Sequence, residues 1–103
     1  GKRIMAGPLD LSAVEQHLKD ASEFMRMWSR EGGAMCIIEP QNLGADPAMF
    51  GIAMADAIRH GAKAWARAVE VSEDHALERI MQGFNAEMKS PTDTPRDFTA
   101  KPN

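Results

Sequence analysis

Hydrophobic residues in the second half of the chain recur at the three- and four-residue steps of two amphipathic helices. Asp46 and Pro47 are favoured residues at a helix start, so the pattern predicts a helix from Pro47 to about Val69. Ser72 is placed to cap a second helix that ends near Lys89, before a proline. An apolar stripe continues along this second helix: Leu77, Ile80, Met81, Phe84 and Met88.

The first half of the chain fits two patterns. Hydrophobic residues between Leu11 and Trp28 have the spacing of one long helix. Alternatively, a short helix from about Ser12 to Lys19, capped by Ser12, ends near Ala21 and a strand begins at Glu23. We favour the second pattern because "EFMRMWSR" and "AMCIIEP" are joined across "EGG", which is typical of a β-hairpin.

A two-residue loop of Gly32 and Gly33 predicts the pairing of the two strands. Trp28 then lies opposite Ile37, and Arg26 lies opposite Glu39. Both are favoured cross-strand pairs, worth roughly 0.2–1 kcal/mol each.

The two faces of the predicted hairpin differ. One is apolar and is expected to receive the helices: Met25, Met27, Cys36 and Ile38. The other mixes apolar and charged side chains, and an isolated two-stranded ribbon is marginally stable. We therefore expect an α+β fold, a β-hairpin followed by two α-helices, with a short N-terminal helix as an optional element and completion by homodimerisation. Residues 11–90 form the single domain, between flexible ends at 1–10 and 91–103.

Composition narrows the classes of partner. The net charge of −3 disfavours nucleic acid and anionic membranes as partners. The single cysteine, the absence of a long apolar run and the lack of a signal-peptide pattern indicate a cytoplasmic protein. Eight methionines fit either core filling, which we favour, or an adaptable partner surface.

The hairpin and the central helix together resemble a family of bacterial proteins of similar length that is known only as a domain of unknown function. The resemblance covers about residues 21–93 and departs from the family at Phe50 and Trp65, where the family more often has Trp and Tyr. It implies the hairpin-and-helix order and brings no activity. The matching positions are Arg26, Trp28, Gly32, Gly33, Asp46, Pro47, Phe50, Gly51, Asp56, Arg59 and His60.

Asp56, Arg59 and His60 lie within about one turn of the central helix and, with Arg26 and Trp28, form the candidate functional surface. The charged residues from 56 to 70 share one stripe, so a solvated face is the favoured interpretation and a functional surface the alternative. Asp56 and His60 supply too few ligands for a metal site. No catalytic constellation is identifiable, and we expect no catalytic residue, metal or cofactor.

Two functions follow from this pattern. The first is a non-enzymatic, homodimeric protein-interaction module with an unidentified protein partner. The alternative is a small anionic-ligand binder or enzyme with a pocket around Asp56, Arg59 and His60. The sequence favours a protein without enzymatic activity, but it does not decide between these two functions.

Overall fold

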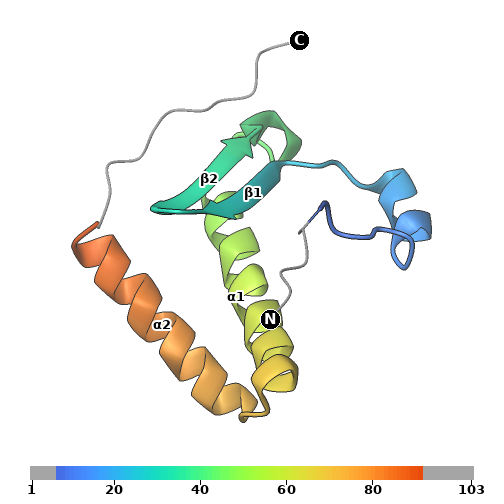
Figure 1. The fold of residues 1–103 in the computed structure, drawn as a ribbon. Helices are drawn as coiled ribbons and strands as arrows, with labels where there is room; N and C mark the ends of the chain where they lie inside the picture. Colours follow the sequence, from blue (N-terminus) through green and yellow to red (C-terminus); the bar gives the residue numbers. More distant parts are fainter. Residues whose placement is uncertain (1–6, 92–103) are drawn as a thin grey trace.

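A computed structural model describes residues 7–91 and shows a β-hairpin followed by two helices (Figure 1). Most of the two expected flexible ends, residues 1–6 and 92–103, lie outside the described residues. The predicted α+β class is confirmed. The elements are η1 (Glu15–Asp20), β1 (Met25–Arg30), β2 (Gly33–Ile38), η2 (Pro40–Asn42), α1 (Ala48–Val69) and α2 (Glu73–Lys89).

Both long helices begin and end close to the predicted residues. α1 begins at Ala48, one residue later than predicted, and Pro47 is its N-cap. The carboxylate of Asp46 accepts a hydrogen bond from the backbone N–H of Ala48 at 3.0 Å. Glu70 ends α1 in the left-handed conformation, with φ 55° and ψ 52°. The Ser72 hydroxyl accepts from the backbone N–H of His75 at 3.0 Å, which confirms the predicted cap of α2.

The hairpin is confirmed, but its predicted pairing was wrong by two residues. The turn consists of Glu31 and Gly32, and Gly33 is the first residue of β2. Gly32 has a φ of 90°, as the second central residue of a type II turn requires. The observed pairs are Met25–Ile38, Arg26–Ile37, Met27–Cys36, Trp28–Met35, Ser29–Ala34 and Arg30–Gly33.

A shift of two residues keeps every side chain on its predicted face, because side chains alternate with a period of two. The predicted Arg26–Glu39 pair is nevertheless absent. The backbone N–H of Glu39 bonds to the carbonyl of Phe24 at 2.8 Å. Its carboxylate accepts from the backbone N–H of Gln41 at 3.1 Å and so caps η2.

The leading helix is shorter than predicted, and Ser12 does not cap it. η1 is a 3-10 helix, and its N-cap, Val14, makes no side-chain cap hydrogen bond. The backbone N–H of Ser12 donates to the carboxylate of Asp10 at 3.0 Å instead, which forms a turn. Short helices are marginal without tertiary packing, and η1 packs on no other element of the described chain.

Packing between elements is concentrated at two places. Ala62 of α1 and Ala76 of α2 are 4% and 6% exposed, where the helices meet. The rings of Phe24 and Phe50 meet edge to face, with centroids 6.4 Å apart and planes at 84°, where the hairpin crosses α1. The expected apolar face of the hairpin is not covered as a unit, since Met27 is 60% exposed. Toward its C-terminal end, α2 diverges from α1 (Figure 1).

Candidate functional site

The three predicted site residues of the central helix point away from the helix pair. Asp56, Arg59 and His60 are exposed on α1, whereas Ala62 of the same helix is buried against α2. Within residues 7–91, their side chains make no hydrogen bond or ion pair with one another or with a neighbour. The structure therefore places them on an open surface, as a solvated stripe requires.

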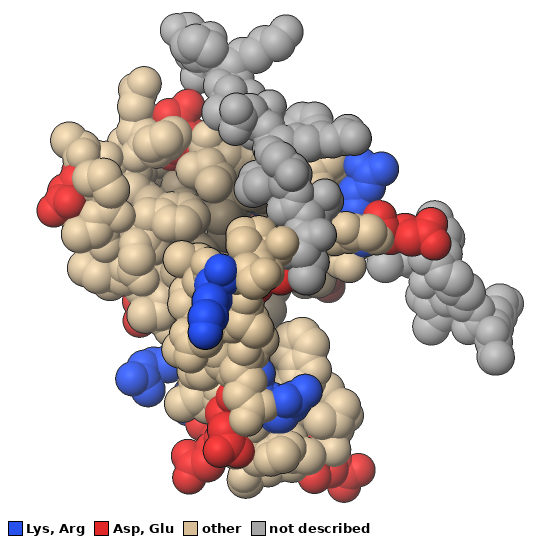
Figure 2. Space-filling model, turned by 90° about the vertical axis from the view of Figure 1, so that its left-hand side faces the viewer, with Lys and Arg blue, Asp and Glu red and all other residues tan. Residues whose placement is uncertain are grey.

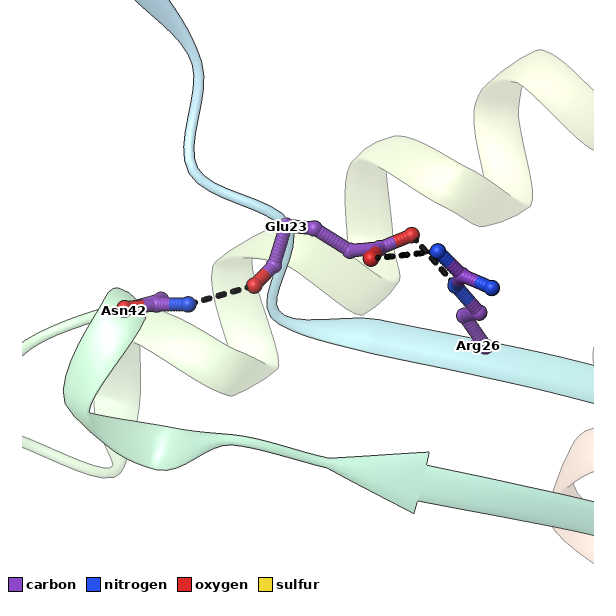
Figure 3. A network of polar contacts seen from close by, with 3 residues as sticks. All are labelled: Glu23, Arg26 and Asn42. Carbon is purple, nitrogen blue, oxygen red and sulfur yellow. Dashed lines mark hydrogen bonds and ion pairs between the residues drawn. The ribbon is translucent and has the colours of Figure 1, made fainter. Parts of the chain in front are cut away.

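Arg26 is engaged locally, at the entry to β1. Its guanidinium forms two hydrogen bonds with the carboxylate of Glu23, Nε to Oε2 at 2.7 Å and Nη2 to Oε1 at 3.0 Å (Figure 3). The hydrogen bond from Arg26 lowers the pKa of Glu23, and the same contact raises the pKa of Arg26. Trp28, two residues along the strand, is 41% exposed.

Glu23 is also held through its backbone. The side-chain amide of Asn42, in η2, donates to the carbonyl oxygen of Glu23 (Figure 3). This contact joins residues 19 positions apart in the sequence. The start of the hairpin is thus tied to the loop that follows its end.

An open pocket of about 360 Å³ lies at the junction of α1 and α2. Its apolar wall comes from Trp65 and Val69 of α1, from Val71 between the helices, and from Ile80 of α2. His75 and Arg79 also line it, and the Arg79 guanidinium donates to the side chain of Gln82.

This pocket contains none of the predicted site residues, and sequence reasoning missed it. Trp65 and Val69 are 61% and 57% exposed although they lie on the apolar side of α1. Their spacing of four residues at the end of a helix was the available signal.

Large hydrophobic side chains remain exposed on every main element. They are Leu9, Leu11, Val14 and Leu18 before the hairpin, Met27, Trp28 and Ile37 on it, Met49, Ile52, Trp65 and Val69 on α1, and Phe84 and Met88 on α2. Figure 2 shows one face on which uncharged residues form a broad area in the upper half, with charged side chains dispersed around it. Isolated exposed hydrophobic residues are ordinary, but a broad apolar surface marks an interaction site.

Metal-ligating and nucleophilic groups are dispersed in the described part of the chain. No three His, Cys, Asp or Glu side chains gather there in a way that could hold a metal ion. The thiol of Cys36 is half-buried in β2 and forms no disulfide. No helix among residues 7–91 is long and apolar enough to span a membrane.

The described residues form a small α+β domain that leaves thirteen large hydrophobic side chains exposed. The chain belongs to a family described as domain of unknown function DUF5076, whose sequence profile matches residues 8–92. This confirms the family class that the sequence motifs indicated.

A solved structure supports the same fold. A protein from the photosynthetic bacterium Rhodopseudomonas palustrus CGA009, provisionally described as a pyruvate dehydrogenase, is 34% identical to this chain. The match covers 98% of both chains, with a TM-score of 0.63. No curated protein matches the chain significantly.

Proposed function

We propose that this protein is a non-enzymatic, homodimeric interaction module. The observation that carries the proposal is the apolar surface that one copy leaves uncovered. Among the described residues only Ala62 and Ala76 are buried, while thirteen large hydrophobic residues are exposed. A chain of 103 residues is close to the size at which one core supplies marginal stability, so association would stabilise it.

The magnitude is sufficient for association. Burying a large apolar side chain completely contributes about 1.5–3 kcal/mol. The thirteen side chains are about half exposed on average, so covering them would contribute about 10–20 kcal/mol in gross terms. Association costs about 4–15 kcal/mol, so burial of part of this surface on both copies is sufficient for a stable dimer.

The outer stripe of α1 is the surface that we assign to a further protein partner. Asp56, Arg59 and His60 are exposed there and have no partner among the described side chains. With Arg26 and Trp28 they remain the proposed functional surface. We place the protein in the cytoplasm, which its single cysteine supports.

Sedimentation equilibrium over a wide range of protein concentration tests the dimer. We expect a mass of twice the 11.3 kDa of one chain, with dissociation on dilution. A mass of one chain at every concentration would refute the proposal. Retention of the wild-type protein, but not of an Asp56→Ala/Arg59→Ala/His60→Ala variant, by one identified binding protein would support the assignment of the α1 stripe.

A further inference from the structure

Residues 7–22, here called the N-terminal arm, are separate from the rest of the described chain. Figure 1 shows the arm projecting to one side of the hairpin, away from α2. Its hydrogen bonds join arm residues to one another: Leu11 to Val14 at 3.0 Å, Val14 to His17 at 2.9 Å, and Leu18 to Ala21 at 3.1 Å. Within the described residues, no hydrogen bond joins the arm to residues 23–91.

The arm nevertheless carries apolar side chains. Leu11, Val14 and Leu18 are 54%, 42% and 45% exposed. They lie three and four residues apart, with Leu18 in η1, Val14 at its N-cap and Leu11 one turn earlier. This row, here called the arm stripe, has the form of a docking surface without a partner in the described chain.

The root of the arm is held by hydrogen bonds to the hairpin and to η2, whereas the arm itself has no hydrogen bond to residues 23–91. Asn42 and Arg26 hold Glu23 in place (Figure 3), and Ala21, two residues earlier, is extended with φ −105° and ψ 152°. Because no hydrogen bond joins the arm to residues 23–91, a change of backbone angles between Ala21 and Glu23 would redirect the arm without breaking one. Exchange of such a terminal element between copies is a low-cost route to a dimer.

The pocket between α1 and α2 matches the arm stripe in size and polarity. The pocket volume of about 360 Å³ lies within the range of about 300–1,000 Å³ that is usual for ligand pockets, so apolar side chains of the arm can enter it. Its exposed walls, Trp65 and Val69, would be covered by the same contact.

The charges of the two surfaces are also complementary. The arm contains one lysine and three acidic residues, Asp10, Glu15 and Asp20. With histidine counted as neutral, the net charge of the arm is 1 − 3 = −2. The pocket is lined by Arg79 and His75, and no acidic residue lines it. Complementary charge favours encounter and fixes the orientation of docking.

We propose that the arm of each copy docks into the α1–α2 pocket of the other copy. This inference rests on the homodimer proposed above and names the contact that forms it. The exchange is reciprocal, so the two contacts are related by a two-fold axis. This contact places the arm stripe of one copy against the pocket of the other, so both apolar surfaces are covered.

Two matched pairs of variants test the contact by sedimentation equilibrium. Leu11→Ser/Leu18→Ser removes the arm stripe, and Leu9→Ser is its control outside the stripe. Val69→Ser alters the pocket, and Ile52→Ser on the outer side of α1 is its control, since these two side chains are 57% and 56% exposed. We expect the dimer Kd to rise about 10- to 100-fold in the stripe and pocket variants and about threefold or less in the controls.

Disulfide trapping distinguishes exchange from docking within one chain. In a Cys36→Ser background, a chain with Leu18→Cys is mixed with a chain carrying Val69→Cys and oxidised. A covalent heterodimer is the expected result. A chain carrying both cysteines that closes an intrachain disulfide, with no heterodimer on mixing, would show docking in cis and overturn the inference.

The outcomes also separate this inference from the proposed function. If the wild-type protein is a dimer, but its Kd is unchanged by the stripe variant and no heterodimer forms, arm exchange is wrong and the dimer stands. If the wild-type protein is monomeric at every concentration, the proposed function and the inference both fail.

Discussion

The attachment of the hairpin to α1 depends on two aromatic rings, and a double-mutant cycle can measure their coupling. Phe24 and Phe50 are half-buried, with ring centroids 6.4 Å apart and planes at 84°. Phe24→Leu and Phe50→Leu each keep most of the apolar volume and remove one ring. An edge-to-face pair contributes about 0.5–1.5 kcal/mol beyond the area it buries. We therefore expect a coupling free energy in that range.

Urea denaturation of the wild-type protein, the two single variants and the double variant gives the coupling directly. All four are compared at one protein concentration, because the stability of an associating chain depends on it. Phe50→Leu combined with Val69→Ala is the control, since Val69 lies at the other end of α1, about 28 Å away at 1.5 Å for each residue. Distant changes add within about 0.3–0.5 kcal/mol. Additivity for the Phe24–Phe50 cycle as well would refute a specific ring contact.

Three further predictions concern substitutions at Glu70, at Arg26, and at Arg59 together with His60. Glu70→Gly should raise the free energy of unfolding, measured by urea titration, by about 0.5–1 kcal/mol. The reason is that Glu70 has a φ of 55°, a conformation that costs a residue with a side chain about 1–2 kcal/mol. A lower free energy of unfolding in the variant would contradict this prediction. Arg26→Leu should raise the pKa of Glu23 toward its usual value in an NMR titration, whereas Arg30→Leu should not. Because folding lowers the pKa of Glu23, the contribution of this ion pair to stability is present above the ordinary carboxyl pKa and is lost as the pH falls through the folded-state value. Arg59→Ala/His60→Ala should change the free energy of unfolding by less than about 0.5 kcal/mol, as expected at exposed positions; a loss above about 1.5 kcal/mol would show that these side chains are buried by a partner.

The parts of the fold that the sequence predicted are those decided by neighbouring residues. Asp46 accepts a hydrogen bond from Ala48 at the start of α1, and Ser72 caps α2, so the helix boundaries follow from contacts that span two or three residues. The pairing of the two strands depends on which residues form the two-residue turn. Because Gly32 and Gly33 are adjacent, the sequence is compatible with a turn of both glycines and with a turn that contains Gly32 alone. The structure places Gly32 in the turn and Gly33 in the strand.

The parts that the sequence did not predict depend on packing between distant residues. Ser12 is a good capping residue by type, but η1 lacks a tertiary contact that would extend it into an α-helix. The pocket at Trp65 and Val69 exists because α2 leaves these side chains uncovered on the apolar side of α1. The angle between two packed helices depends on the side chains of both helices, so the residue pattern of one helix does not predict it.

The methionines now favour a partner surface over core filling at three positions. Met27, Met49 and Met88 lie on three different elements and are 60%, 42% and 71% exposed. Methionine is flexible and polarizable, so it accommodates partner surfaces that differ in shape. A dimer contact has one fixed shape and gains little from this property, whereas a surface that meets several partners gains much. Arm exchange would occupy the α1–α2 pocket, and none of these three methionines lines that pocket.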